Sequence, residues 1–521
     1  MDNRNGRAGA DNNQLANSEL IIGLACAVGT DIALVIELLS NRLKELGYET
    51  ELIKISKLLI EPTIPGGISK ELSSYARVNK LMDQGNELRK RFEPGPYSIL
   101  ASGVAHCINQ IRQKYSKENN QEDETQIQIS KTAFIIDSLK HPDEVEKLRE
   151  IYPSGFYMFV VNESEEGRAR HLMDVKNMGK ADATELIHRD MEESTPYGQH
   201  TRAVFELADF HLSANVHSSD GNKSNQRESA LKPQIDRILN LIFGHPFITP
   251  TFDEYAMFMA YSSGLRSADL SRQVGAVIAK NNDIIATGAN DVPCFGGGQY
   301  WPDEEYKDFP QGRDYTRGFD SNKIELKKIV DEIIDIYTYG ETPQEEEDFK
   351  IKSRKAVLSS SLKELTEYGR PVHAEMAAIM SCSRNSISTQ DATLYCSTFP
   401  CHNCAKHIIS SGIKKVVYIE PYPKSRTLDL YNDSITINGE ADKVSFSEFV
   451  GIGPRRFYDL FSLRLSTGAR IRRKGENGYC VKWSEENARV RCQMISTSYI
   501  DKEAMEALKW ENNLEGRGQT K

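Results

Sequence analysis

The strongest constraint on folding in this sequence is a pair of short segments, His-Ala-Glu at residues 373–375 and Pro-Cys-His-Asn-Cys at residues 400–404. Each segment begins at or just after a proline, a residue favoured in the first turn of a helix, and Gly412 favours the end of the second helix. Cys401 and Cys404 are then one turn apart on the same helix face. A histidine can meet both cysteines only if the two helices pack side by side, so the pattern predicts a tertiary contact.

These residues have the composition of a catalytic zinc site. His373, Cys401 and Cys404 provide one imidazole and two thiolates, the three protein ligands of a zinc ion that keeps a fourth position for water. Both cysteines lie at the positive end of their helix, which favours the thiolate that binds metal. Glu375 is the candidate base, which takes a proton from water and returns it to a leaving amine.

A structural zinc site is the alternative interpretation, with a fourth ligand such as Cys396 or His407. A purely structural site has no use for a carboxylate two residues from its histidine. In contrast, His-x-Glu followed by Pro-Cys-x-x-Cys is typical of zinc enzymes that deaminate nucleobases. The sequence therefore favours the catalytic interpretation.

A resemblance to the cytidine and deoxycytidylate deaminase superfamily runs through three segments, SRQVGAVIAKNNDIIATGAN, PVHAEMAAI and LYCSTFPCHNCAKHIISSGIKKVVYIEPYPKS. The resemblance implies that His373, Cys401 and Cys404 bind a zinc ion (Zn²⁺) and that Glu375 shuttles protons. It also implies that Asn290, which closes the predicted strand hairpin, holds the sugar of the nucleotide. The catalytic motifs are highly specific, and those of the first half are weaker.

Most of the chain is similar to the two-domain anti-phage dCTP deaminases of bacteria, which join such a domain to an N-terminal P-loop kinase-like domain. This resemblance implies hydrolytic deamination of dCTP, and of dCMP, to the uracil nucleotide, which depletes dCTP in an infected cell. It also implies a homo-oligomer and, in one branch of the family, a small RNA that restrains the enzyme.

In the first half, apolar strand-like runs alternate with helix-like segments, which predicts a parallel sheet covered on both faces. The segment GLACAVGTD contains Gly23, Gly29 and Thr30 after the first strand, and Asp137 ends a later strand. These are the candidate nucleotide-binding residues. However, no Lys precedes Thr30 as a phosphate-binding loop requires, so a regulatory nucleotide is expected here rather than phosphoryl transfer.

At 521 residues the chain exceeds the size of a single core, so several α/β domains are expected. We predict a kinase-like parallel sheet followed by a cytidine deaminase-like α/β/α domain with mixed strands. The expected boundaries are a flexible N-terminus at 1–18, a kinase-like domain at 19–217, a linker and helix at 218–243, a deaminase domain at 244–465 with an insertion at 295–370, and a C-terminal extension at 466–521.

A nucleotide substrate needs cations near its phosphates, and Arg266 and Arg272 lie close in sequence to the predicted hairpin. Arginine suits phosphate because its guanidinium donates two parallel hydrogen bonds. We therefore predict that both residues bind substrate, with ordinary surface charge as the alternative for either one.

The net charge of −10, from 65 Lys and Arg against 75 Asp and Glu, argues against a global attraction to nucleic acid. It weighs against the second functional hypothesis, a deaminase acting on cytosine or adenine in single-stranded nucleic acid, and any such contact must use a local patch. The third hypothesis is a non-enzymatic, nucleotide-triggered signalling module. The polar N-terminus is unlike a signal peptide, and no apolar run approaches the roughly 20 residues that span a bilayer. A cytoplasmic protein without membrane contact is expected.

Overall fold

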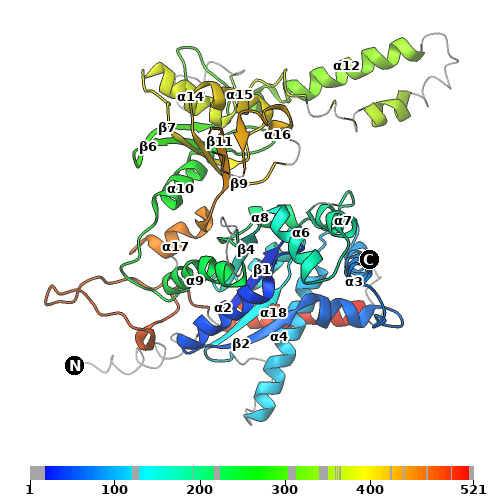
Figure 1. The fold of residues 1–521 in the computed structure, drawn as a ribbon, viewed down its shortest axis with the longest axis vertical. Coiled ribbons are helices and arrows are strands. Elements are labelled where there is room, and N and C mark those ends of the chain that lie inside the picture. Colours follow the sequence, from blue (N-terminus) through cyan, green and yellow to red (C-terminus); the bar gives the residue numbers. More distant parts are fainter. Residues whose placement is uncertain are drawn as a thin grey trace. The chain divides into compact units, whose positions relative to one another are not determined.

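The computed structural model describes residues 18–119, 128–191, 193–215, 223–302, 312–338, 350–357, 360, 362, 365–422, 425–437, 439–440, 442–464, 468–494 and 496–514. The chain divides into two compact units: a first unit of residues 1–254 with 450–521, and a second unit of residues 255–449. Each unit is built around one six-stranded sheet (Figure 1). The predicted α/β class is confirmed for both units.

The sheet of the first unit has the strand order β12-β5-β4-β1-β3-β2, and all its pairs are parallel except the one between β12 and β5. Its elements are β1 (Leu20–Cys26), α2 (Ile32–Glu45), β2 (Glu49–Lys54), η1 (Ser56–Ile60), η2 (Glu61–Thr63), α3 (Ser74–Lys90), α4 (Ile99–Glu118), β3 (Thr132–Asp137), α5 (Pro142–Ile151), β4 (Phe156–Asn162), α6 (Glu165–Asp174), α7 (Lys180–Met191), α8 (Thr201–Glu206), β5 (Phe210–Ser213), α9 (Lys223–Ile242), β12 (Gly451–Ile452), η5 (Pro454–Arg456), α17 (Phe457–Phe461), η6 (Glu485–Asn487) and α18 (Ser496–Leu514).

Both faces of this sheet are covered, because successive side chains of a strand point to opposite sides. In β1, Ile21 packs into a core with α4, α5 and α18, whereas Ile22 packs into a second core with α2 and α9. Every residue of β1, β3 and β4 is buried. The continuous apolar runs of the sequence thus correspond to strands buried on both faces, as predicted.

The C-terminal segment returns to the first unit, which differs from the boundaries expected from the sequence. The backbone N–H of Ile452 donates to Glu254 Oε1 at 2.9 Å, and β12 adds a strand beside β5. Helix α18 packs along α4, where the buried Arg112 forms ion pairs with Glu19 and Glu503. The described residues between 450 and 514 therefore complete the first unit, to which helix α9 also belongs.

His211 in β5 makes the stability of the first unit depend on pH. Burial lowers the pKa of His211 from 6.5 to about 4. The unfolded chain therefore binds a proton that the folded chain excludes between these values, so stability is full above pH 6.5 and is lost as the pH falls toward 4. We expect a loss of about 3 kcal/mol over this window. Hydrogen exchange of the β5 amides, corrected for intrinsic rates, measures this loss of stability. The substitution His211→Leu is expected to remove the pH dependence. If the variant lost as much stability as the wild type over the same pH range, the assignment to His211 would be wrong.

The sheet of the second unit is mixed, with the order β10-β11-β9-β8-β6-β7. β6 runs antiparallel to both β7 and β8, whereas β8, β9, β11 and β10 are parallel to one another. The elements are α10 (Phe252–Gly264), β6 (Gly275–Lys280), β7 (Asp283–Ala289), α11 (Asp314–Arg317), α12 (Ser321–Thr338), α14 (Ala374–Arg384), β8 (Thr393–Thr398), α15 (His402–Ser410), β9 (Lys415–Glu420), α16 (Thr427–Leu430), β10 (Ile435–Thr436) and β11 (Val444–Glu448).

Two glycines let helices approach this sheet closely. A Cβ on Gly288 of β7 would lie 2.1 Å from the carbonyl oxygen of Ala374 in α14. A Cβ on Gly275 of β6 would lie 1.8 Å from the carbonyl oxygen of Ala260 in α10. Because paired residues Ala276 and Gly288 share the face that packs with α14, while Gly275 contacts α10, the two helices cover opposite faces. No helix of the described residues is long and apolar enough to cross a membrane.

Candidate active site

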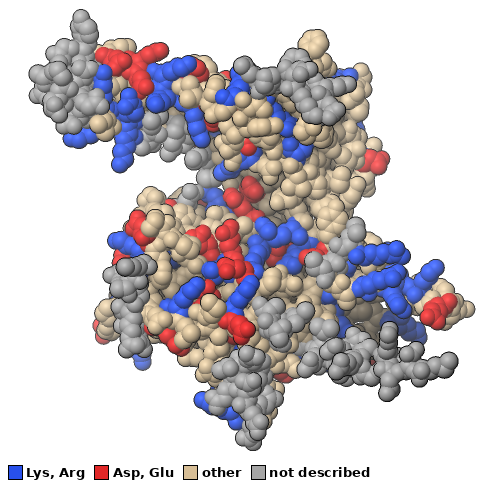
Figure 2. Space-filling model, turned by 180° about the vertical axis from the view of Figure 1, so that it is seen from behind, with Lys and Arg blue, Asp and Glu red and all other residues tan. Residues whose placement is uncertain are grey.

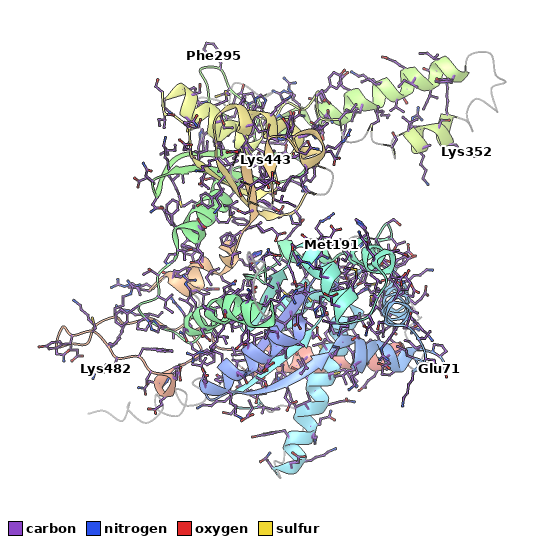
Figure 3. The ribbon with its side chains drawn as sticks, viewed as in Figure 1. Glu71, Met191, Phe295, Lys352, Lys443 and Lys482 are labelled. Atoms are coloured by element: carbon purple, nitrogen blue, oxygen red, sulfur yellow. The ribbon has the colours of Figure 1, made fainter. Side chains whose placement is uncertain are left out.

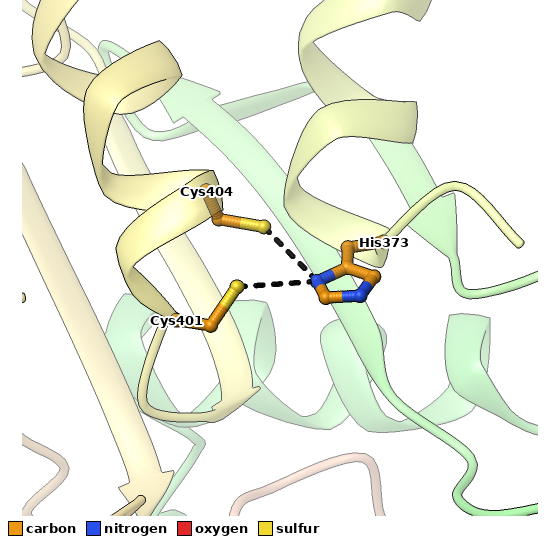
Figure 4. A group of neighbouring side chains, drawn as sticks. All are labelled: His373, Cys401 and Cys404. Atoms are coloured by element: carbon orange, nitrogen blue, oxygen red, sulfur yellow. Dashed lines mark hydrogen bonds between the residues drawn. The ribbon is translucent and has the colours of Figure 1, made fainter. Parts of the chain in front are cut away.

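The imidazole of His373 lies between the two predicted cysteine ligands. Its Nδ1 is 3.3 Å from the Sγ of Cys401 and 3.3 Å from the Sγ of Cys404 (Figure 4). The three ligand atoms lie within 4.8 Å of one another, and no other group of three or more such side chains occurs among the described residues. Cys396 and His407 are not part of it, so the fourth protein ligand of a structural zinc site is not found there.

The helix starts bring these side chains together. His373 is the N-cap residue of α14 and Cys401 is the N-cap residue of α15, with Cys404 in the first turn that follows. Both helices pack on the same face of the sheet, against β6 and β8. Strand β8 ends at Thr398 and leads directly into α15. The side-by-side packing predicted from the sequence is confirmed.

The charges of the group suit a divalent cation. The hydrogen bond with Cys404 lowers the pKa of Cys401 to about 3, whereas the pKa of Cys404 is raised well above its usual value. The hydrogen bond with Cys401 raises the pKa of His373 to about 9. Without metal, one thiolate and one imidazolium thus form an ion pair. One nitrogen and two sulfur ligands are a set that zinc prefers, and its binding would replace the protons on His373 and Cys404.

Glu375 follows His373 in α14 and is buried, with 4% of its surface exposed. Burial raises the pKa of its carboxyl group, and the Cys404 thiol donates a hydrogen bond to it. The buried Cys396 thiol also donates to this carboxylate. A carboxylate that takes up a proton more readily than usual, beside a metal-ligand group, has the properties of a general acid and base.

A cavity of about 450 Å³ adjoins the group and lies entirely within the second unit. It falls in the range of small-molecule binding sites. Its wall includes side chains from the loop before β6, from the end of β7, from the segment between β7 and α14, and from the starts of α14 and α15. The lining residues are Asp269, Leu270, Ser271, Arg272, Val274, Asn290, Asp314, Asp320, Asn322, Lys323, Leu326, Thr366, Gly369, Pro371, His373, Ala374, Glu375, Thr398, Phe399, Cys401, His402 and Tyr422.

Of the three predicted substrate-binding residues, two line the cavity. Asn290 is buried, with its Oδ1 accepting from Val274 N–H and its Nδ2 donating to the Arg272 carbonyl, both at 2.7 Å. This amide holds in place the segment that carries Arg272. The Arg272 guanidinium lies 5.7 Å from the ring centre of Tyr422. It has no carboxylate within 4.0 Å in the described part of the chain, although its charge also acts on the more distant carboxylate of Glu420.

Arg266 does not line this cavity. Its Nη2 donates to the Tyr300 carbonyl at 2.7 Å, and its guanidinium stacks 3.7 Å from the ring centre of Trp301. These contacts hold the loop after β7. Sequence proximity to the hairpin did not distinguish it from Arg272, because the turn between them points the two side chains to different places.

Several lining residues lie far in sequence from the two motifs and were not predicted. Asp314, Asp320, Lys323 and Thr366 belong to the inserted segment at 295–370, which therefore supplies part of the wall. His402 follows Cys401, and its Nδ1 is buried without a hydrogen-bond partner among the described residues. Mixed Asp, Arg and Gly in residues 312–322 was the available signal, but such composition is also common in surface loops.

In the first unit, packing accounts for both glycines of the predicted nucleotide loop. A Cβ on Gly23 would lie 2.8 Å from the Phe156 ring, and a Cβ on Gly29, whose φ is +94°, would lie 2.7 Å from the Arg168 carbonyl oxygen. The hydroxyl of Thr30 is buried without a hydrogen-bond partner among the described residues. Asp137 ends β3 as predicted, and its carboxylate lies 3.5 Å from Lys54 Nζ.

A carboxylate of the protein itself occupies the place beside this loop. Asp190 Oδ2 accepts from the backbone N–H of Val28 at 2.8 Å, and Asp190 Oδ1 lies 2.8 Å from Lys140 Nζ. The same ammonium donates to the Cys26 carbonyl at 2.7 Å. A phosphate would seek these donors too, so the internal ion pair competes with nucleotide binding here.

A family model described as "Cytidine and deoxycytidylate deaminase zinc-binding region" matches residues 250–420, which include His373, Glu375, Cys401 and Cys404. The chain is 33% identical over 170 residues to deoxycytidylate deaminase of Enterobacteria phage T4, covering 32% of this chain and 77% of that protein. It is 26% identical over 182 residues to the human deoxycytidylate deaminase, covering 35% of this chain and 67% of that protein.

A crystal structure of dCMP deaminase from the cyanophage S-TIM5, in complex with dCMP and dUMP, is similar at 19% identity. The alignment covers 39% of this chain and 100% of that chain, with a TM-score of 0.22. The identity to the phage T4 deaminase, over 77% of that protein, places the chain in its family.

Proposed function

Because the chain belongs to the deoxycytidylate deaminase family, we propose that it hydrolyses the exocyclic amine of deoxycytidine nucleotides, consuming water and releasing ammonia and the deoxyuridine nucleotide. The observation that carries the proposal is the group of His373, Cys401 and Cys404 with the buried carboxylate of Glu375, on the wall of one cavity. A metal-ligand group, an acid–base group and space for a nucleotide thus meet in one place.

In this proposal His373, Cys401 and Cys404 hold a zinc ion. When bound, zinc in a site of three protein ligands makes water a better nucleophile at neutral pH. The donor set fits the metal, since the cysteine at the start of α15 is readily ionised and all three ligand atoms are close together.

Glu375 moves the protons of the reaction. Its carboxylate takes one proton from the attacking water and delivers it to the ring nitrogen of the base; it then takes the second proton from the new hydroxyl group and delivers it to the departing amine. Burial helps Glu375 both to accept and to deliver a proton, because it raises the pKa of the carboxyl group and keeps competing water from it. The buried thiol of Cys396, which is not part of the ligand group, donates to the carboxylate and orients it.

Arg272 and Asn290 are proposed to bind the nucleotide. The guanidinium of Arg272 suits a phosphate, and the amide of Asn290 fixes the segment beside it. Lys323 adds a second cation to the wall, whereas Asp269, Asp314 and Asp320 are acidic. We propose that both dCMP and dCTP are accepted.

Depletion of dCTP as a defence against phage is the proposed biological action, and the resemblance stated above supports it. We further propose a regulatory nucleotide in the first unit and a cytoplasmic location. The resemblance, rather than the residues themselves, implies a homo-oligomer and a restraining small RNA. For the regulatory nucleotide, the Asp190–Lys140 ion pair means that a ligand must displace a carboxylate to reach the loop.

A panel of substrates tests the proposal. The purified zinc-loaded chain is incubated separately with dCMP, dCTP, CTP, cytidine and a cytosine-containing single-stranded oligonucleotide, and uracil products are measured by mass spectrometry. Conversion of dCMP or dCTP is the expected result. Conversion of the oligonucleotide alone would move the protein to the nucleic-acid deaminases, and no conversion at all would favour the non-enzymatic hypothesis.

Arg272→Gln is expected to raise the KM for dCMP by about 10- to 100-fold with a smaller change in kcat, since a charge-assisted contact contributes about 1.5–3 kcal/mol. Steady-state kinetics with dCMP and with cytidine measure the effect, and cytidine, which lacks the phosphate, should be much less affected. Arg266→Gln is the comparison, because Arg266 lies away from the cavity. The assignment would be contradicted if KM rose equally in the Arg272 and Arg266 variants, or if it rose equally for dCMP and cytidine.

A further inference from the structure

Residues 469–491 of the first unit form an extended excursion that we call the basic hairpin. Its two arms pair through a bridge between Lys474 and Cys480, and the N–H of Val481 donates to the Arg473 carbonyl at 3.1 Å. The base is tied to the end of α9, because Arg491 N–H donates to the Ile242 carbonyl and Trp483 Nε1 donates to the Phe243 carbonyl. The hairpin is therefore held in place at its base while its outer part is exposed.

A cavity of about 320 Å³ lies between the basic hairpin and the end of α9. Four exposed cations line it, namely Arg470, Arg472, Lys482 and Arg489, and no acidic residue does. Within the described ranges, none of the four has a carboxylate within 4.0 Å. Arg491 also lines the cavity, but its guanidinium is buried and donates to the carbonyls of Leu460 and Ser462.

This concentration of positive charge contrasts with the net charge of −10 for the whole chain. Figure 2 shows Lys and Arg side chains gathered on the projecting segment, and Figure 3 labels Lys482 on it. Four unpaired cations around one cavity repel each other, which costs free energy in the absence of a ligand. An anionic partner relieves this repulsion, so the cavity is suited to phosphate groups.

The exposed surface of the hairpin continues beyond the cavity. Lys474 is exposed on its outer part and Tyr479 near its turn has 75% of its surface exposed, whereas Arg473 Nε donates to the Pro246 carbonyl at 2.8 Å. Four exposed cations around a cavity, with an exposed aromatic ring on the same hairpin, match how proteins bind single strands, where phosphates contact a basic groove and bases stack on aromatic side chains. The exposed Glu476 near the turn leaves the cavity as the basic part of the hairpin. A single nucleotide bound in the cavity would leave Lys474 and Tyr479 unused.

We propose that the basic hairpin binds the phosphate backbone of single-stranded nucleic acid. The sequence requires a local patch for any such contact, because its overall charge is negative, and the hairpin is such a patch. The proposal stands independently of the deaminase activity, since the cavity and its cations lie wholly in the first unit.

The test measures binding of the full chain to a fluorescently labelled 20-nucleotide RNA and to the matching single-stranded DNA by anisotropy, between 50 and 300 mM NaCl. With about four phosphates neutralised, log K is expected to fall with log salt with a slope of about −3. A quadruple variant should bind at least tenfold more weakly at 100 mM NaCl with a slope near zero: Arg470→Gln, Arg472→Gln, Lys482→Gln and Arg489→Gln.

A matched control removes four exposed lysines elsewhere in the first unit and should bind like the wild type: Lys44→Gln, Lys57→Gln, Lys114→Gln and Lys117→Gln. Thermal unfolding establishes that both variants are folded. Tyr479→Leu, which keeps every charge, is expected to weaken binding about tenfold without changing the salt slope, since one stacked base contributes about 1–3 kcal/mol.

Free nucleotide is the other source of phosphate, so ATP and dCTP are tested in the same assay. Binding of ATP or dCTP through these four side chains without binding of either oligonucleotide would overturn the assignment to a backbone. Absence of oligonucleotide binding by the wild type at 50 mM NaCl, or equal losses in the hairpin variant and the control variant, would overturn it as well.

Discussion

Glu375→Gln is expected to lower kcat for dCMP by about 10⁴-fold while the chain keeps one zinc ion. The amide has nearly the shape of the carboxylate, so α14 and the ligand group should be undisturbed. However, the amide cannot accept a proton from water or deliver one to the amine, and general acid–base catalysis contributes about 10²–10⁴-fold. We expect the upper end because one residue serves both steps.

Product formation from dCMP, measured together with bound zinc by mass spectrometry, checks this expectation. Glu448→Gln is the control, because it makes the same substitution at an exposed position of β11 in the same unit. Substantial turnover by Glu375→Gln would remove the proposed proton carrier. Loss of zinc together with activity would instead mean that the carboxylate supports the metal site.

Cys404→Ser is expected to abolish stable zinc binding, with less than about 0.1 zinc per chain after gel filtration, and with it deamination. A hydroxyl ionises far less readily than a thiol, and zinc sites of this type depend on thiolate ligands. Cys404 lies in the first turn of α15, with its Sγ 3.3 Å from the Nδ1 of His373. Loss of this one ligand leaves only an imidazole and one thiolate.

Cys382→Ser is a matched control for that variant. Cys382 is a buried thiol in α14, 1% exposed, and it is not part of the ligand group. Zinc content should therefore stay near that of the wild type in this control. If Cys404→Ser retained zinc as well as the control does, the assigned ligand set would be wrong.

The local elements of the fold could be predicted because their signals are close together in the sequence. The buried runs at β1, β3 and β4, the helix before Gly47, and the two-asparagine turn between β6 and β7 all follow from residues within one element or its cap. Asn281 and Asn282 have positive φ angles of 53° and 62°, as a tight turn between antiparallel strands requires. The metal-ligand group was equally predictable, because its spacing demands a specific helix contact.

The surroundings of the predicted nucleotide loop in the first unit could not be predicted from the sequence. Gly23, Gly29 and Thr30 resemble a phosphate-binding loop in sequence, but the carboxylate beside that loop comes from Asp190, more than 150 positions away. Nothing near the loop indicates this partner. Whether a carboxylate lies beside a loop of this sequence depends on how α7, which carries Asp190, packs against it.

The sequence by itself therefore determined the α/β class and the candidate metal-ligand and acid–base residues, since each depends on short-range spacing and on the chemistry of the side chains. Only the tertiary structure decided that the last segment adds a strand to the first sheet and that Arg272 rather than Arg266 lines the cavity of the second unit. It alone also brought Arg470, Arg472, Lys482 and Arg489 together around one cavity. These features depend on contacts between residues that are far apart in the sequence. Burial, packing and charge together determine such contacts, and no local sequence pattern indicates them.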